Sequence, residues 1–188
     1  MKIIENILKN KVYISNGEII DINLDIKSMF KLTKGMDITD IYYDLIYESM
    51  LSKAIYIITL KDRTVFELIQ KLKEKYRKEN YFIINDVVEK LKELNLLDDK
   101  EFALRYININ SNYSINKLKS KLILKGISID IISEVISELD LNENQEELIK
   151  KFILKNSKLD KQKLFRKLIS KGFEYNRVLY CLNYEENE

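Results

Sequence analysis

Two adjacent carboxylates and three pairs of lysines are the residues of this sequence that could do chemistry. Asp98 and Asp99 lie in the stretch LNLLDDKEFALRYI, and paired carboxylates can serve acid/base catalysis or bind a hard metal ion. The chain has no histidine, and no nucleophile–base pair, phosphate-binding glycine loop or metal cluster can be assembled from the sequence. We therefore expect neither catalysis nor a metal ion or other cofactor.

The place of Asp98, just before an apolar periodic segment, favours a structural role instead. As the N-cap of a helix, Asp98 would accept hydrogen bonds from backbone N–H groups of the first turn. Glu101 would complete a capping box, and Leu97 and Phe102 would form a hydrophobic staple. Asp99 would lie in the first turn, where negative charge suits the helix dipole. We interpret the two aspartates as helix-start residues.

Composition indicates a folded protein of nearly balanced charge. Of the 188 residues, 46% are hydrophobic and 33% charged, with a net charge of +2, which leaves enough apolar surface for a core. Cys181 is the single cysteine, so an internal disulfide is excluded, and we interpret it as a small buried side chain. Glu5 and Lys9 interrupt the apolar N-terminus, unlike a signal peptide. No apolar run approaches the ~20 residues of a membrane helix. We expect a soluble, cytoplasmic protein.

A repeat of 45–50 residues runs through the chain. LKSKLILKGI (118–127) and LFRKLISKGF (164–173) coincide at six of ten positions. LIQKLKEKYR (68–77) keeps two leucines and two lysines of that pattern, but Tyr76 stands where the other copies have glycine. A period of this length is typical of repeat proteins.

Each copy of the repeat begins its middle helix with the same kind of residue. Thr64, Ser114 and Asp160 all lie four residues before the aligned leucine, where a side-chain oxygen can cap the first turn. Gly126 and Gly172 follow the ends of two of these helices. Because glycine adopts positive φ at low cost, both are expected to be left-handed C-caps.

The repeat and the N-terminal pattern together predict the fold class. We expect a mostly α protein with three tandem three-helix repeats in an extended array, preceded by a small N-terminal β-hairpin region. Asn16-Gly17 between two alternating segments signals a two-residue type I′ turn, and Thr39 can cap the helix that follows. The predicted domains are 1–47 (hairpin and linking helix), 48–97 (repeat 1), 98–141 (repeat 2) and 142–188 (repeat 3).

The helices of the three modules can be placed from the same alignment. A short helical stretch near 25–32 and a turn at Gly35 precede them. The predicted helices lie near 48–61, 65–76 and 86–95 in the first module, 99–110, 115–125 and 129–139 in the second, and 145–156, 161–171 and 174–183 in the third.

Basic residues concentrate in the third repeat. Residues 148–180 hold ten lysines and arginines against Asp160 and Glu174, a local net charge of +8, which is typical of a surface for an acidic or polyanionic partner. Lysine pairs spaced i, i+4 also recur on the polar face of each middle helix; they would form a row if the modules stack alike, or a merely solvated face. The candidate partner-binding residues are Lys163, Arg166, Lys167, Lys171, Lys117, Lys121, Lys125, Lys71 and Lys75.

Several tyrosines accompany the lysines. Tyr106, Tyr113, Tyr175 and Tyr180 could stack nucleobases, or they could cover the edges of the core. For Tyr106 and Tyr113 the sequence favours packing.

At this point the chain resembles a known family. The stretch LNLLDDKEFALRYI, a capped helix ending in LKG and a degenerate third copy resemble the RecX family of recombination regulators over essentially the whole chain, with 96–103 as the most specific element. The resemblance implies tandem three-helix modules that bind the RecA recombinase filament and modulate it, usually by inhibition, in DNA recombination and repair. The first module departs from the family pattern in its missing glycine and longer connection, and lysine replaces much of the family's arginine.

The sequence leaves several functions open. The leading hypothesis is a non-enzymatic regulator that binds a RecA–DNA filament through several modules at once, so that weak contacts add. A second is a three-helix-module protein that binds single- or double-stranded DNA directly. A third is a helical adaptor unrelated to recombination. No membrane and no small-molecule substrate are expected as partners.

Overall fold

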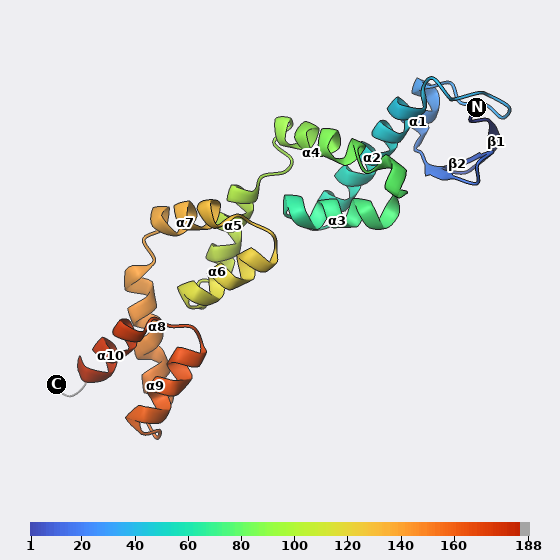
Figure 1. Cartoon of the computed structure of the whole chain (residues 1–188). Helices are drawn as coiled ribbons and strands as arrows, with labels where there is room; N and C mark the ends of the chain where they lie inside the picture. The colour runs from blue at the N-terminus through green and yellow to red at the C-terminus, as the bar shows by residue number, and fades with distance from the viewer. Residues whose placement is uncertain (185–188) are drawn as a thin grey trace. The chain divides into compact units, whose positions relative to one another are not determined.

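The computed structural model describes residues 1–184, except the side chains of residues 142, 143, 183 and 184, and the chain divides into two compact units. The first unit is Met1–Leu97, and the second begins at Asp98. The described part contains ten α-helices, one short 3₁₀ helix and one small sheet at the N-terminus (Figure 1). The predicted fold class, mostly helical with a small N-terminal β region, is confirmed.

The first unit packs a small sheet and a short helix against three longer helices. The antiparallel sheet has the order β1-β2-β3, and Val12 pairs with Ile7 on one side and Ile20 on the other. Val12 and Ile20 are buried in one core with Leu45 and Leu68 of the helices. The elements are β1 (Ile4–Leu8), β2 (Lys11–Ile14), β3 (Ile19–Asp21), α1 (Leu24–Met29), α2 (Tyr42–Leu60), α3 (Val65–Lys75), η1 (Lys78–Asn80) and α4 (Ile83–Glu93).

The prediction of a two-residue type I′ turn at Asn16-Gly17 is wrong. Gly17 has a φ of 75°, whereas Asn16 does not have positive φ, and type I′ requires positive φ at both positions. The Gly17 N–H donates to the Ile14 carbonyl at 2.8 Å, and the Asn16 side chain accepts from the Glu18 N–H at 3.1 Å. The chain therefore uses a three-residue loop with a left-handed glycine, which also suits a hairpin.

The predicted cap at Thr39 is also wrong. Helix α2 begins at Tyr42, its N-cap residue is Ile41, and no side chain caps it. The Thr39 hydroxyl instead accepts from the Lys2 N–H at 2.9 Å and donates to Asp37 at 2.6 Å. Because Thr39 is engaged with the N-terminal segment, α2 starts without a capping side chain and well before residue 48.

A buried carboxylate joins the sheet to the helices of the first unit. Glu18 is 5% exposed, and its two oxygens accept hydrogen bonds from the Tyr42 hydroxyl at 2.7 Å and the Asn80 amide at 3.0 Å. Burial, followed by the hydrogen bond to Glu18, raises the pKa of Tyr42 to about 12. Since a buried carboxylate needs such donors, this group fixes the hairpin against α2 and η1.

Helix α3 ends differently from its counterparts because Tyr76 replaces their glycine. Tyr76 continues in an extended conformation with a φ of −105°, and its hydroxyl lies 3.0 Å from that of Ser49. Ser49 donates to the Asp21 carbonyl at 2.6 Å, and the Lys75 ammonium lies 2.7 Å from the Asp21 carboxylate. The end of α3 is thus attached to β3.

The second unit contains two groups of three helices, each with its own core. Phe102, Leu118 and Val135 are buried in the first group, and Leu164 and Val178 in the second. The helices are α5 (Asp99–Ile109), α6 (Ile115–Leu124) and α7 (Ile129–Glu138), then α8 (Asn142–Lys155), α9 (Lys161–Ser170) and α10 (Tyr175–Tyr184).

Side-chain caps start several helices of the second unit, whereas α8 begins without one. The Asp98 carboxylate accepts from the N–H groups of Lys100 and Glu101 at 2.7 and 3.0 Å. Ser114 caps α6 and Asp160 caps α9 in the same way. Leu97 is buried in the core of the first unit and Phe102 in that of the second.

Gly126 and Gly172 end α6 and α9 with φ values of 81° and 87°. In each case the following residue donates back to a leucine carbonyl, Ile127 to Leu122 and Phe173 to Leu168, both at 3.2 Å. This arrangement is the Schellman motif, in which a left-handed residue satisfies the last helical carbonyls.

Polar contacts join the two helix groups of the second unit at the start of α6. The Ser114 hydroxyl donates to the Lys171 carbonyl at 2.7 Å. Gln145, which is 3% exposed, accepts from the Ile115 N–H at 3.1 Å and donates to the Tyr113 carbonyl at 3.2 Å. The start of α6 is therefore attached both to α8 and to the end of α9, which fixes the two groups against each other.

The half-buried Tyr76 predicts a pH dependence of stability. Burial raises the pKa of Tyr76 to about 12, against about 10 in an unfolded chain. The resulting stabilisation is complete below pH ~10 and is lost as the pH rises toward the folded pKa, because the ionised phenolate favours unfolding. The free energy of unfolding, measured in urea, should fall more steeply above pH ~10 in the wild type than in Tyr76→Phe. The exposed Tyr56→Phe serves as control and should keep the wild-type profile; equal slopes for all three proteins would contradict the argument.

A side chain should be tolerated less well at Gly172 than at a glycine with open space beside it. An alanine Cβ there would lie 2.8 Å from the Ser114 Oγ, whereas at Gly35, with a similar φ of 83°, nothing lies within 4 Å. Gly35→Ala should cost about 1–2 kcal/mol from backbone conformation alone. Gly172→Ala should cost roughly a further 1–3 kcal/mol from overpacking. Hydrogen exchange should show the added loss of protection in α6 and α9; equal costs for the two variants would show that the junction yields freely.

Candidate partner-binding surface

Helix α9 presents the basic residues that the sequence analysis selected in the third module. Leu164 and Leu168 face the core at 4% and 0% exposure. The spacing of 3.6 residues per turn then turns the intervening polar side chains to solvent. The exposed basic residues of this helix and its C-cap are Lys161, Lys163, Arg166, Lys167 and Lys171, and the last four are those that the sequence analysis selected.

These four basic residues differ in their contacts within the chain. The Lys163 ammonium lies 3.2 Å from the Asp160 carboxylate, and the Lys163 backbone N–H, followed by its side chain, lowers the pKa of Asp160. The Lys171 ammonium lies 5.3 Å from the centroid of the Phe152 ring, within cation–π range. Among residues 1–184, Arg166 and Lys167 form no ion pair, so their charges are available to a partner.

A shallow groove between α9 and α10 adds apolar surface beside Arg166. Its volume is about 380 Å³. Phe165 meets the Tyr175 ring edge-on with centroids 5.2 Å apart, which holds the aromatic wall in place. The groove combines apolar side chains with a cationic rim and is lined by Lys161, Gln162, Phe165, Arg166, Leu179 and Leu182.

The lysines of α6 lie partly against aromatic rings. The Lys117 ammonium is 3.6 Å from the centroid of the Tyr113 ring, and the Lys125 ammonium is 5.2 Å from that of Phe102. Lys121 is exposed and forms no ion pair within the described residues. Of the three, Lys121 is thus the cation least engaged by its own chain.

The lysines of α3 have partners in the first unit. The Lys71 ammonium lies 2.7 Å from Glu74, and the Lys75 ammonium lies 2.7 Å from Asp21. Lys75 therefore has a structural role in holding α3 to β3, and at both of these positions in α3 the positive charge is paired within the chain.

The junction in the second unit brings Lys117 at the start of α6 close to Lys171 at the end of α9. Ser114 accepts from the Lys117 N–H at 3.3 Å while it donates to the Lys171 carbonyl. A Cβ on Gly172 would lie 3.4 Å from the Lys117 nitrogen, so the end of α9 touches the first turn of α6. We call Lys163, Arg166, Lys167, Lys171, Lys117 and Lys121 the basic surface.

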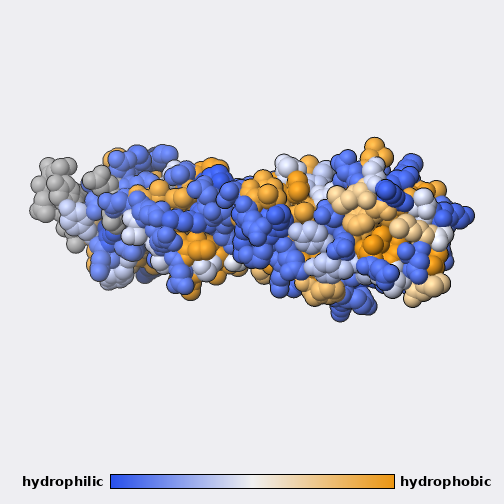
Figure 2. Space-filling view, turned by 90° about the horizontal axis from the view of Figure 1, so that it is seen from above, coloured by the Kyte–Doolittle hydropathy of each residue, from blue (hydrophilic) through white to orange (hydrophobic). Residues whose placement is uncertain are grey.

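The tyrosines fall into two classes. Tyr106 stacks on Phe102 with centroids 6.2 Å apart, and Tyr106 and Tyr113 both pack against the core of α5–α7. Tyr175 and Tyr180 are exposed on α10. On the face shown in Figure 2, hydrophobic residues form separate patches among hydrophilic ones.

The carboxylates at the start of α5 are not gathered into a site. The Lys100 ammonium lies 2.7 Å from both Glu134 and Glu138, and the hydrogen bonds that it donates to these two carboxylates hold the pKa of Lys100 above the usual range. Within residues 1–184, no group of three or more acidic or cysteine side chains is placed to hold a metal ion. In the same range, no helix is long and apolar enough to cross a membrane.

Sequence reasoning missed the apolar part of this surface. Phe165 and Leu179 look like ordinary core residues from their spacing, and only packing shows that Leu179 stays 37% exposed beside Arg166. The high density of apolar residues in 173–182 was the one available signal, and it cannot separate a groove wall from a core residue.

Comparison with known proteins assigns the family. The sequence matches none of the protein-family models. It is similar to the regulatory protein RecX of Clostridioides difficile, with 32% identity over 92% of this chain and 87% of the relative. It is likewise similar to that of Streptococcus sanguinis, with 32% identity over 100% of this chain and 78% of the relative.

Solved structures agree in fold. A crystal structure of a regulatory protein RecX matches with a TM-score of 0.62 at 21% identity, over 94% of this chain and 97% of the other. RecX from Lactobacillus salivarius matches with a TM-score of 0.64 at 21% identity, over 76% and 97%. From the sequence relatives and this shared fold together, the chain belongs to the RecX family of regulatory proteins.

Proposed function

We propose that this protein is a non-enzymatic, cytoplasmic regulator that binds the RecA recombinase filament and inhibits its ATPase and strand-exchange activity. Family membership supports the regulatory role, because the relatives are named regulatory proteins. The observation that carries a binding role is the basic surface, where α6 and the end of α9 meet at a fixed junction.

The chemistry of this surface suits an extended acidic partner. Arg166 offers a planar fork for carboxylate or phosphate, and the adjoining groove offers apolar contact. Each exposed charge contributes little by itself. Because the junction holds several cations at fixed spacing, their contributions can add on a partner that repeats the same acidic groups.

The modular organisation is part of the proposal. We treat 48–97, 98–141 and 142–188 as three repeats, each able to contact successive subunits of a helical filament. In this arrangement the second and third repeats act as one rigid pair through Ser114 and Gln145, and the first contributes a weaker contact because Lys71 and Lys75 are paired internally.

Titration into a RecA assay tests the function directly. DNA-dependent ATP hydrolysis and strand exchange should both fall as the protein is added. Unchanged activity at several-fold excess over filament subunits would overturn the proposal. Equally tight binding to bare DNA with and without RecA would favour the alternative, a three-helix-module protein that acts on nucleic acid itself.

Charge reversal tests the surface. Changing Lys163, Arg166, Lys167 and Lys171 to glutamate should abolish most of the inhibition, because the positive charge facing the filament is reversed while the core leucines remain. A control that reverses charge outside the three repeats should inhibit normally. The control replaces three exposed lysines of the first unit by glutamate: Lys27, Lys31 and Lys34.

The salt dependence of binding distinguishes a protein partner with carboxylates from single-stranded nucleic acid. If the basic surface meets protein carboxylates, the difference between wild type and charge-reversed protein should shrink at high ionic strength, where exposed charges are screened. If it meets single-stranded phosphates, the slope of log affinity against log salt should flatten by about 0.7 for each lost contact. A folded charge-reversed protein that still inhibits fully would show that this surface is merely solvated.

A further inference from the structure

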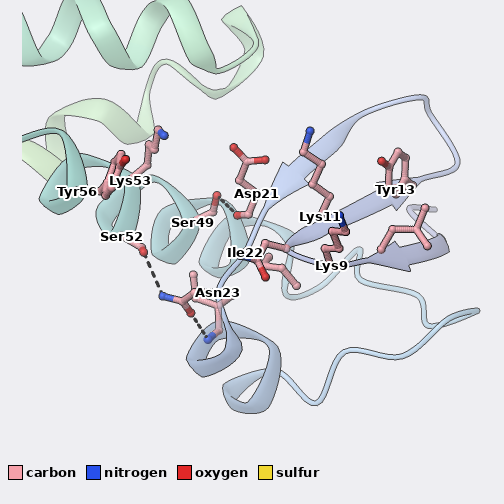
Figure 3. Close-up of a pocket in the computed structure, with 13 residues that line it drawn as sticks. Lys9, Lys11, Tyr13, Asp21, Ile22, Asn23, Ser49, Ser52, Lys53 and Tyr56 are labelled. Atoms are coloured by element: carbon pink, nitrogen blue, oxygen red, sulfur yellow. Dashed lines mark hydrogen bonds between the residues drawn. The ribbon is translucent and has the colours of Figure 1, made fainter.

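A second hollow lies inside the first unit, between the β1–β2 turn, the start of α1 and one face of α2 (Figure 3). Its volume is about 840 Å³, in the range of sites that hold small ligands or peptide segments. The lining residues from α2 are spaced i, i+3, i+4 and i+7, which places them on one face of the helix. They are Ser49, Ser52, Lys53 and Tyr56.

Hydrogen bonds fix the walls of this hollow. Ser49 donates to the Asp21 carbonyl at 2.6 Å, which holds α2 to β3. The Asn23 amide donates to the Ser52 hydroxyl at 3.2 Å, and its oxygen accepts from the Ile26 N–H at 2.8 Å. The hydrogen bonds of Ser49 and Asn23 are drawn in Figure 3. Because α2 is bonded to the sheet and to α1, the hollow is preformed.

The lining of the hollow is apolar inside and positive at the rim. Leu8, Ile22 and Ile26 contribute apolar surface, and Leu8 is 53% exposed, so its side chain is accessible to a ligand. The cations come from opposite sides in Figure 3, two from the hairpin and one from α2. They are Lys9, Lys11 and Lys53.

The positive charge at this rim is not neutralised within the described residues. Lys9, Lys11 and Lys53 form no ion pair there, and the Lys53 ammonium lies 4.8 Å from the centroid of the Tyr56 ring. The one carboxylate in the lining, Asp21, is paired with Lys75 at 2.7 Å. The hollow therefore has a net attraction for a negatively charged ligand.

The turn between β1 and β2 places Lys9 at the rim. Lys9 is the first residue of the two-residue turn between Leu8 and Lys11, and its φ is 51°. Glycine, asparagine or aspartate ordinarily occupies such a position. Lys31, outside the hollow, has a similar φ of 48°, so the case for binding rests on the lining of the hollow and its charge.

We propose that this hollow, lined by Lys9, Lys11 and Lys53, is a docking site for an acidic peptide segment of a partner protein, with apolar side chains between its carboxylates. An aliphatic floor and a lysine rim complement such a segment. A nucleic-acid phosphate fits this hollow less well than such a peptide. The Ile26 N–H at the start of α1 already donates to the Asn23 side chain, and the lysines are separated around an apolar floor. This site goes beyond the proposed function, and its test does not depend on the outcome of the RecA assays.

Peptide binding by the full-length protein tests the site. The probe is a labelled pool of short peptides in which glutamate alternates with a mixture of Leu, Ile, Phe and Tyr, and the same pool with glutamine is its neutral counterpart. The acidic pool should bind saturably, and the neutral pool roughly tenfold or more weakly, because the rim contributes through charge.

Variants assign that binding to the hollow. The triple variant Lys9→Gln, Lys11→Gln, Lys53→Gln should weaken acidic-pool binding by about tenfold, and Leu8→Gln should weaken it without any change of charge. The control variant Lys27→Gln, Lys34→Gln, Lys61→Gln removes as much charge elsewhere in the unit and should bind as wild type. Circular dichroism confirms that each variant is folded.

Three outcomes would overturn the proposal. They are absence of saturable binding by the acidic pool, equal binding by the hollow and control variants, and a single-stranded oligonucleotide that binds through the same lysines while the peptides do not. The RecA assays use the charge-reversed α9, so failure of one proposal leaves the other measurable.

Discussion

The second unit depends on one hydroxyl group. Ser114 accepts the first-turn N–H of Lys117 and donates to the Lys171 carbonyl, two roles that a hydroxyl can fill at once because it has one proton and two lone pairs. Gly172 follows directly and leaves no room for a Cβ against this oxygen. The N-cap of one helix and the C-cap of another are thus a single contact, and the relative placement of two modules follows from it.

The first unit attaches the end of its middle helix, α3, to a neighbouring element through different residues. Thr64 occupies the cap position and is fully buried, but Tyr76 stands in place of the glycine. Its ring fills space beside the sheet, and its hydroxyl meets Ser49, which itself bonds β3. Whereas the end of α9 packs against the start of α6, the first module packs the end of α3 against a strand, because the hairpin is its neighbour.

This difference changes what the equivalent lysines can do. Lys75 and Lys171 align in the repeat, yet Lys75 forms an ion pair with Asp21 of the sheet, while Lys171 lies over Phe152 at the module junction. A residue type that recurs at one position of the repeat therefore does not have the same function in each copy. The packing partner of each module decides which cations are available to another molecule.

The sequence by itself determined the local structure of this protein. Caps at Thr64, Ser114 and Asp160 and left-handed glycines at Gly126 and Gly172 depend on a few neighbouring residues, so spacing alone identified them. Local signals failed where a distant segment competed: Thr39 bonds Lys2 instead of capping α2. Only the tertiary structure decided the groove beside Arg166, the hollow behind Lys9 and the Ser114–Lys171 junction, because each joins residues far apart in the chain, and a one-dimensional pattern carries no information on which surfaces meet.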